Sequence, residues 1–203
     1  MKIAVLATDG SWNELVQSKP DVEWIRSANN HSFLSNNGAD AYFNLLENAA
    51  EMEYASIQMK PVYINSVITT LKKMGAARNI YRINGWNGFI KRDSWEIAGN
   101  LTEEASAILT QINKHAIVVP DEPGFIAARV ISMIINEAYF AKEENVSTEK
   151  EIDIAMKLGT NYPFGPFEWS KLIGLQHIYH LLKILSEDDY RYKPSSLLEQ
   201  EAK

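Results

Sequence analysis

The sequence predicts an α/β domain built on a parallel sheet, followed by an all-α domain. Over residues 1–119, short apolar runs alternate with helical patterns, which is typical of parallel strands joined by helices. Over residues 120–203 the apolar residues recur with helical spacing only. The segment 120–124 contains two prolines and a glycine, and we expect it to be the hinge between domains 1–119 and 120–203.

Composition excludes several kinds of protein. The chain has 203 residues, of which 46% are hydrophobic, enough for one large or two small domains with a core. Its net charge of −6 argues against nucleic acid and anionic membranes as partners. Cysteine is absent, which excludes disulfides and thiolate metal sites. The N-terminal apolar run is too short for a signal sequence, and no run reaches the roughly 18 apolar residues of a membrane span. We therefore expect a soluble cytoplasmic protein.

Seven strands are expected in the first domain. The first, at residues 2–8, is an apolar run bounded by Asp9-Gly10. The others are expected at residues 22–27, 39–46, 61–65, 80–83, 94–98 and 116–119. Because the segment before residue 65 is short for two nucleotide-binding halves, we expect some connecting helices to be reduced to loops.

Three helices are expected between these strands. Ser11 can cap a short helix to residue 16, which Pro20 stops. A second helix is expected at residues 66–74 and a third at residues 102–113. For the third, Asn100 followed by Glu103 forms a helix-start signature.

The second domain reads as a series of helices. Pro123 suits the first turn of a helix that runs to about residue 143 and is apolar nearly all round. Thr148 and Glu151 form a capping box for the next helix, which Gly159 ends. Gly174 separates helices at residues 167–172 and 175–185, and Pro194 begins a last helix to residue 199. The apolar surface of these helices predicts a partner subunit.

The turn after the first strand argues against a bound dinucleotide. A dinucleotide needs a glycine-rich turn there, so that backbone amides can approach its pyrophosphate. Here the turn contains Gly10 alone. Asp9 adds a negative charge and Trp12 adds bulk at the same approach. We therefore favour an ordinary strand, turn and helix over a working NAD site.

Several segments of the second domain carry a family resemblance. They are PGFI at residues 123–126 with Arg129, NEA at 136–138, EID at 151–153, AMKLG at 155–159 and PFGPFE at 163–168. Together they resemble the C-terminal domain of the 3-hydroxyacyl-CoA dehydrogenases. The resemblance implies a degenerate Rossmann-like domain ahead of it, a homodimer formed through the helical domain, and oxidation of an L-3-hydroxyacyl-CoA with NAD.

The resemblance also implies where the catalytic residues lie. The segment INGWNG at residues 83–88 is similar to the family segment that carries the catalytic His, and Asn84 stands at the position of that His. Asn87 matches an Asn that lies near the cofactor in the family. Glu96, twelve residues after Asn84, matches the Glu that orients the His.

Further departures fall on the residues that contact substrate and cofactor. Ser66 and Val67 follow a strand where the family has Thr and a substrate-contacting Ser. Ala128 replaces a substrate-binding Asn. Glu47 matches a Glu near the cofactor, although the spacing around it is compressed.

The substitution at Asn84 removes the expected base. In the family the His takes the proton of the 3-hydroxyl group while hydride leaves for NAD, and a general base is worth roughly 10²–10⁴-fold in rate. A carboxamide cannot accept that proton, but it can still hydrogen-bond a ketone or thioester oxygen. Without the His, Glu96 is either a residual site carboxylate or a structural one.

Other polar residues favour structural roles. His115 reads as a strand-start residue, and no third ligand accompanies His177 and His180, so we expect no metal site. The pairs Lys72-Lys73 and Lys91-Arg92 are solvated by default, although they are the paired basic residues available to the phosphates of CoA.

Three functional hypotheses remain. The first is a 3-hydroxyacyl-CoA dehydrogenase-like protein that is impaired or inactive and still binds an acyl-CoA-type ligand. The second is a non-catalytic dimerisation or scaffold protein without a small-molecule ligand. The third is an active enzyme whose catalytic residues lie elsewhere. Asn87 and Glu96 favour a retained pocket, whereas Asn84, Val67 and Ala128 favour the scaffold.

Overall fold

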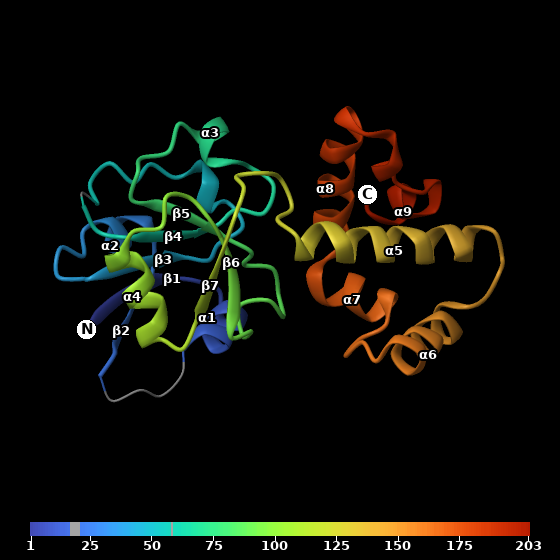
Figure 1. Ribbon diagram of the computed structural model, residues 1–203, viewed down its shortest axis with the longest axis horizontal. Helices are drawn as coiled ribbons and strands as arrows, with labels where there is room; N and C mark the ends of the chain where they lie inside the picture. Colours follow the sequence, from blue (N-terminus) through green and yellow to red (C-terminus); the bar gives the residue numbers. More distant parts are fainter. Residues whose placement is uncertain (17–20, 58) are drawn as a thin grey trace. The chain divides into compact units, whose positions relative to one another are not determined.

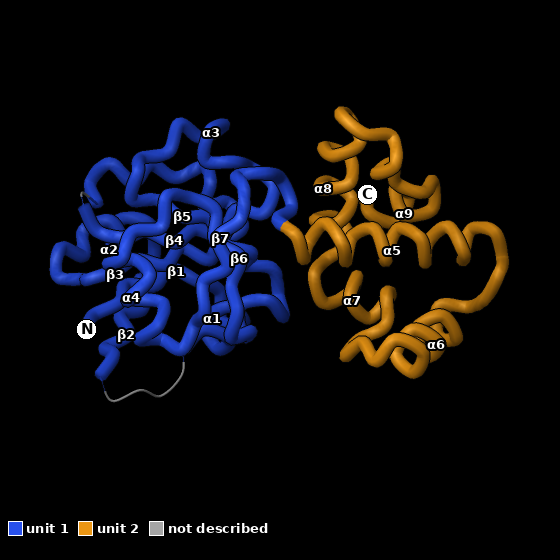
Figure 2. Tube along the Cα trace, in the orientation of Figure 1, with its two compact units in different colours: residues 1–125 blue, residues 126–203 orange. Residues whose placement is uncertain are grey.

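A computed structural model describes residues 1–16, 21–57 and 59–203. The expectation that Pro20 stops the first helix lies outside the described residues. The chain divides into two compact units, Met1–Phe125 and Ile126–Lys203 (Figure 2). No helix of the described residues is long and apolar enough to cross a bilayer. Each unit is described separately below.

The first unit is built on a seven-stranded sheet in the order β2-β1-β3-β4-β5-β6-β7 (Figure 1). The strands are β1 Lys2–Leu6, β2 Glu23–Arg26, β3 Ala41–Asn44, β4 Val62–Asn65, β5 Ile80–Ile83, β6 Ser94–Ala98 and β7 His115–Val119. Every neighbouring pair is parallel except β5 and β6, which are antiparallel. The expected strands and the Rossmann-like class are confirmed, and the sheet is parallel except at its one antiparallel pair.

The helices of this unit are short. They are α1 Asp9–Leu15, α2 Asn30–Leu34, α3 Leu71–Met74 and α4 Glu103–Gln111, with a single 3₁₀ turn, η1 Ala49–Glu51. The expected helix at residues 66–74 is wrong over its first part, because the hydroxyl of Ser66 donates to the carbonyl of Thr69 and the helix begins only after its cap, Thr70. The sequence predicted that some of the connecting helices are shortened, but it did not predict the helix α2.

Side-chain capping decides where these helices begin. Thr8, not Ser11, caps α1, and its hydroxyl accepts from the amide of Ser11. Thr102, not Asn100, caps α4 and leaves Glu103 in its first turn. The missed helix α2 has a capping box between Asn29 and Ser32. Each cap satisfies an amide that the helix itself leaves without a partner.

Both faces of the sheet are apolar. One face packs α1 and α4 over a cluster that contains Phe43, Tyr63 and Tyr81. These rings form a ladder across β3, β4 and β5, with centroids 4.6 and 5.4 Å apart. The other face packs Phe33, Tyr42 and Ile64 with their neighbours. Burial on both faces explains why the strands read as continuous apolar runs instead of alternating ones.

A buried guanidinium joins the end of this unit to the sheet. Arg82 in β5 is fully buried, and its Nη1 lies 2.5 Å from Oδ1 of Asp121. Its Nε and Nη2 donate to the carbonyls of Ser66 and Val67, at 2.8 and 3.1 Å. Its guanidinium also lies 4.7 Å from the ring centroid of Phe125. The segment 121–125 is thereby fastened to the carboxyl ends of β4 and β5.

Asp121 completes this arrangement. Its carboxylate accepts from the amides of Leu71 and Lys72, both at 3.0 Å, as well as from Arg82. Burial acts to raise the pKa of Asp121, but these hydrogen bonds and the charge of Arg82 outweigh it and hold that pKa below its usual value. The carboxylate therefore stays charged opposite Arg82.

The second unit is all helical. Its helices are α5 Ala127–Glu143, α6 Glu149–Thr160, α7 Pro166–Ile173, α8 Leu175–Asp188 and α9 Ser196–Glu201, with a 3₁₀ turn η2 Tyr190–Tyr192. The capping box of Thr148 and Glu151 and the break at Gly174 are confirmed. We expected the boundary between the domains after residue 119, and the two compact units divide after residue 125.

Three expected helix ends are wrong for backbone reasons. Pro123 lies outside α5, because Gly124 and Phe125 have φ values of 86° and 51° and the helix starts after them. The helix α6 passes Gly159 and ends at Thr160, and the following Asn161 adopts the left-handed conformation. The helix α9 begins after its cap Ser195, not at Pro194.

Residues of the recognisable segments hold this unit together. Asn136 donates to the carbonyl of Lys193 and accepts from the amide of Ser195, both at 2.9 Å. Asp153 accepts from the amide of Phe167 at 2.8 Å. A Cβ atom on Gly165 would lie 2.2 Å from Oδ1 of Asp153, so only glycine fits there. These residues have a structural role, which is independent of catalysis.

Asp121→Asn tests the buried pair. The change leaves the Arg82 charge without its counter-charge, which costs about 3 kcal/mol of unfolding free energy by urea denaturation. Asp9→Asn is the matched control, because Asp9 pairs with Arg26 at the same 2.5 Å but is 88% exposed, and such a pair is worth at most about 1 kcal/mol. Equal losses in the two variants would contradict the assignment.

The same pair predicts an acid dependence. Because the folded-state pKa of Asp121 is depressed, its stabilisation is present above the ordinary value of 3.8 and is lost as pH falls through the lower folded value. The wild type should therefore lose more stability than Asp121→Asn over this acid range. Parallel acid curves would argue against the pair.

Candidate functional site

Asparagines mark the carboxyl edge of the sheet. Asn44 ends β3, Asn65 ends β4 and Asn84 follows β5, and their side chains are 1%, 7% and 8% exposed. The carboxyl edge is where ligands bind in open α/β sheets. Three neighbouring strands thus deliver buried carboxamides to the place where such a fold has its site.

The three carboxamides differ in how they are satisfied. Asn44 donates to the hydroxyl of Tyr54 at 2.8 Å, and Asn65 accepts from the amide of Gly85 at 3.0 Å. Asn84 accepts from the amide of Trp86 at 3.3 Å, but its Nδ2 is buried and has no hydrogen-bond partner among the described residues. An unsatisfied buried donor lowers the free energy of unfolding by roughly 1–3 kcal/mol, so an acceptor that meets this atom would stabilise the protein.

Asn84 and Glu96 lie beyond the last paired residues of β5 and β6. The antiparallel strands β5 and β6 pair Arg82 with Ala98 and Ile83 with Ile97, and β5 ends at Ile83, directly before Asn84. Glu96 lies within β6. A shared catalytic site of Asn84 and Glu96 stays a prediction.

Glu96 lies in the field of an arginine. It is half-buried in β6. Burial lowers the pKa of Arg92, and the charge of Glu96 acts in the opposite direction. Arg92 also lies 4.0 Å from the ring centroid of Phe89. Glu96 thus has a cationic neighbour in place of the imidazole that the resemblance implies.

The loop after β5 is fixed by the protein itself. Lys114, which is 1% exposed, donates to the carbonyls of Ile90 and Arg92, both at 2.8 Å. The carboxylate of Glu14 in α1 accepts from the amide of Gly88 with both oxygens, at 2.8 and 3.1 Å. Asn87 lies exposed in this loop. Sequence reasoning missed Lys114 and Glu14, because nothing in their own neighbourhoods marks them.

The turn after β1 does not fit the pyrophosphate of NAD. The helix α1 has seven residues, and Asp9 stands in its first turn. Arg26 neutralises Asp9 at 2.5 Å and lies 5.2 Å from the ring centroid of Trp12. Glu14 brings a second carboxylate to the same edge. A dinucleotide needs amides and glycines there, whereas this turn offers one glycine and the carboxylate of Asp9.

The other expected contact residues have structural surroundings. The hydroxyl of Ser66 is bonded to Thr69 at 2.6 Å, and the carbonyl of Val67 accepts from the amide of Gly124 at 2.7 Å. Glu47 lies exposed after β3. Ala128 is fully buried in the first turn of α5, in the helical unit. Their binding roles remain predictions.

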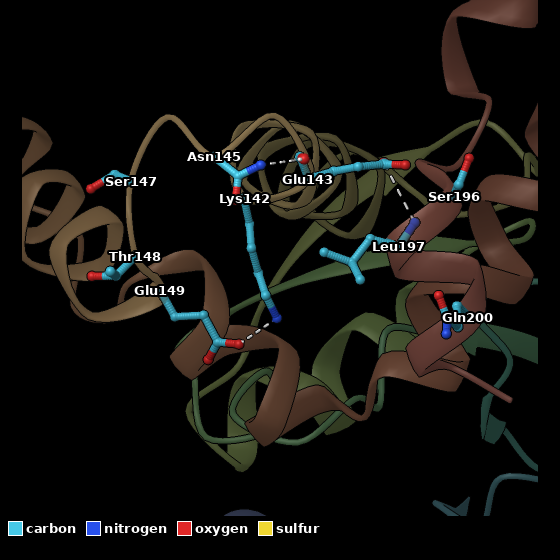
Figure 3. Close-up of a pocket in the computed structure, with 9 residues that line it drawn as sticks. All are labelled: Lys142, Glu143, Asn145, Ser147, Thr148, Glu149, Ser196, Leu197 and Gln200. Carbon is cyan, nitrogen blue, oxygen red and sulfur yellow. Dashed lines mark hydrogen bonds and ion pairs between the residues drawn. The ribbon is translucent and has the colours of Figure 1, made fainter.

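The helical unit has a hollow of its own. It measures about 590 Å³ and lies among the end of α5, the start of α6 and α9 (Figure 3). Its lining is mainly polar and includes Asn145, Ser147 and Gln200. Glu143 points to the amide of Leu197 across one side of it. No group of three His, Cys, Asp or Glu residues in the described chain is arranged to hold a metal.

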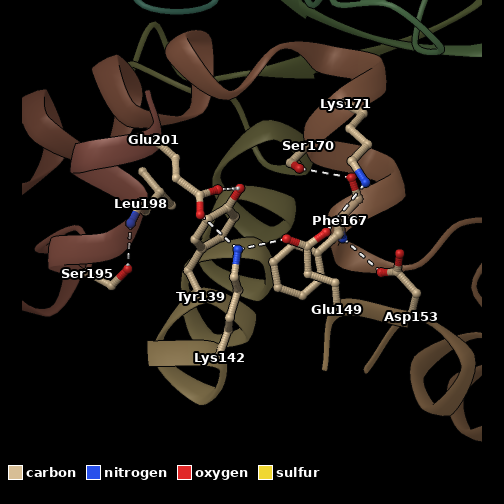
Figure 4. Close-up of polar contacts among 10 residues, drawn as sticks. All are labelled: Tyr139, Lys142, Glu149, Asp153, Phe167, Ser170, Lys171, Ser195, Leu198 and Glu201. Atoms are coloured by element: carbon tan, nitrogen blue, oxygen red, sulfur yellow. Dashed lines mark hydrogen bonds and ion pairs between the residues drawn. The ribbon is translucent and has the colours of Figure 1, made fainter. Parts of the chain in front are cut away.

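Lys142 is not available to a ligand in this hollow. Its Nζ lies 2.7 Å from Glu149 and 2.8 Å from Glu201, so it links α5, α6 and α9 (Figure 4). Burial acts to lower the pKa of Lys142, but the two carboxylates outweigh it and raise that pKa above its usual 10.5. Burial raises the pKa of the neighbouring Tyr139 to about 12. Lys142, Glu149, Glu201 and Tyr139 form a polar cluster whose contacts stabilise the helical unit.

The family model for the C-terminal domain of 3-hydroxyacyl-CoA dehydrogenase matches residues 124–203. The helical unit is therefore similar to the C-terminal domain of this family.

Curated relatives match part of their length. A 3-hydroxyadipyl-CoA dehydrogenase of Escherichia coli is 43% identical over 103 residues, covering 50% of this chain and 22% of that protein. A probable 3-hydroxybutyryl-CoA dehydrogenase of Bacillus subtilis is 35% identical over 102 residues, covering 49% and 36%. The chain thus spans less than half of either relative.

A solved structure extends the likeness of the fold to nearly the whole chain. The (S)-3-hydroxybutyryl-CoA dehydrogenase PaaH1 of Ralstonia eutropha superposes with a TM-score of 0.74. The match covers 98% of this chain and 92% of that one at 18% identity. At this identity the likeness concerns the fold.

Lys142→Met tests the cluster of the helical unit. The change leaves Glu149 and Glu201 without their cation and should cost on the order of 1 kcal/mol, because all three groups are partly exposed. Since the folded-state pKa of Lys142 is raised, its stabilisation is present below 10.5 and fades as pH rises beyond it. Trp169, the tryptophan of this unit, reports its unfolding by fluorescence. A variant as stable as wild type at neutral pH would contradict the role.

Proposed function

We propose that this chain binds an acyl thioester at the carboxyl edge of its sheet without oxidising it. The observation that carries the proposal is the buried, unpartnered Nδ2 of Asn84, directly after β5. This donor stands where the family has its base, and a donor there suits the 3-keto or thioester oxygen of a ligand. The names of the relatives supply the ligand class, a short 3-oxygenated acyl-CoA.

The chemistry of the same residues argues against dehydrogenation. Neutral Asn84 cannot take the proton of a hydroxyl group, so the base of the family reaction is missing at that position. The turn after β1 does not suit the pyrophosphate of NAD. Two independent requirements of the family reaction are thus unmet by the residues present. The proposed ligand site therefore serves binding.

We also propose that the helical unit assembles with a second copy. On α6, Ile154 and Leu158 are 43% and 83% exposed and follow each other by one turn. A row of apolar side chains in water favours a partner surface. The row is also the observation that favours the alternative function, a dimeric scaffold without a small-molecule ligand.

Acetoacetyl-CoA distinguishes these possibilities. The protein should not consume NADH with acetoacetyl-CoA, and acetoacetyl-CoA alone should raise its melting temperature, because a ligand that binds only the native state stabilises it. Asn84→Ala should abolish that rise, and Asn37→Ala, an exposed carboxamide in the same unit, should keep it. A melting temperature that no acyl-CoA changes would favour the scaffold.

The variant Asn84→His tests separately whether the missing base or the missing site for the pyrophosphate of NAD prevents the reaction. The variant restores an imidazole at this position, but the turn after β1 is unchanged, so we expect no NADH consumption with acetoacetyl-CoA. The absorbance of NADH at saturating acetoacetyl-CoA measures it. Turnover by Asn84→His would mean that a dinucleotide does bind and that the base alone was missing.

A further inference from the structure

One face of the sheet is covered mainly by loops and short helices between β3, β4 and β5. The parallel strands β3 and β4 are joined by residues 45–61, which contain one turn of 3₁₀ helix, and β4 and β5 by residues 66–79, which contain the four-residue α3. Parallel strands are usually joined by a full helix that packs on the sheet. Here loops take its place on the face that carries Ile64 and Ile80.

A cavity of about 240 Å³ lies under this cover. Ile64 of β4 and Ile80 of β5 line it from the sheet, and they are 0% and 7% exposed. The connections around η1 and α3 supply the rest of its lining: Ala50, Met52, Glu53, Tyr54, Ala55, Met74, Gly75, Ala76 and Ala77. The walls are thus mostly methyl groups and flexible thioethers, which adapt to the shape of an occupant.

The cavity offers a ligand almost no hydrogen bonds from side chains. The hydroxyl of Tyr54 accepts from Asn44 at 2.8 Å and donates to the carbonyl of Ala49 at 2.7 Å. Among the described lining residues, Glu53 alone is charged, and it is exposed. A space of this kind binds by burial of apolar surface, and a carboxylate at its rim disfavours anionic ligands.

We propose that this cavity is a binding site for a small, uncharged apolar molecule about the size of a bicyclic aromatic ring. An apolar cavity of about 150 Å³ in another protein holds benzene, so the larger space here suits a larger ring system. The site is separate from Asn84 and Glu96, because it lies under the β3–β4 and α3–β5 connections. It stands whether or not an acyl thioester binds at the carboxyl edge.

Methionine methyl NMR tests the proposal with indole as the probe. Of the six methionines, Met52 and Met74 line the cavity, and Met133 and Met156 lie in the helical unit. Indole should shift the methyl signals of Met52 and Met74 and leave Met133 and Met156 unchanged. Unchanged Met52 and Met74 signals at saturating indole, or shifts confined to the helical unit, would overturn the site.

Variants that fill the cavity provide the matched control. Ala50→Leu and Ala76→Leu each place a larger side chain in the lining, so each should weaken indole binding at least about tenfold by excluding the ring. Ala107→Leu, an exposed site on α4, should bind indole as the wild type does. If either folded filling variant binds indole with unchanged affinity, the ring does not occupy this cavity.

Indole-3-acetate tests the choice of an uncharged ligand. Its carboxylate faces Glu53, so it should bind more weakly than indole, by up to roughly fivefold at an exposed rim. Glu53→Gln should remove most of that difference and leave indole binding unchanged. Tighter binding of indole-3-acetate than of indole by the wild type would contradict the assigned ligand class.

Discussion

The buried guanidinium of Arg82 is the interaction on which the arrangement of the first unit depends. It gathers the carbonyls after β4, the carboxylate of Asp121 and the ring of Phe125 around the end of β5. A fully buried cation is stable only if its donors are satisfied, so every segment that supplies an acceptor is held in place. The strand that leads directly into Asn84 is thereby fixed from both sides.

At the carboxyl edge of the sheet, several polar groups of the loops are satisfied by the protein's own side chains. Glu14 occupies the amide of Gly88, Asn65 that of Gly85, and Asp9 is matched by Arg26. Lys114 secures the carbonyls of the same loop. Among the described residues that follow strands of this sheet, two buried side-chain groups have no hydrogen-bond partner, the hydroxyl of Ser27 after β2 and Nδ2 of Asn84 after β5. The helical unit, in contrast, keeps the family residues that pack its helices, such as Asn136 and Asp153.

Much of the fold could be predicted from the sequence because strands buried on both faces leave unmistakable apolar runs. The missed features depend on contacts that are distant in sequence. An apolar run does not reveal that β6 runs antiparallel to β5. The start of α5 depends on the hydrogen bond from the amide of Gly124 to the carbonyl of Val67. The contacts of Arg82 and Glu14 could not be predicted, since their partners lie tens of residues away.

The most direct test of the account is the side-chain amide signal of Asn84 in ¹⁵N–¹H NMR. If this donor meets an acyl oxygen, its Nδ2 protons should move downfield on addition of acetoacetyl-CoA, and CoA without the acyl group should leave them in place. An Asn84 signal that acetoacetyl-CoA does not move, in a protein that nevertheless binds it or reduces it with NADH, would contradict the account.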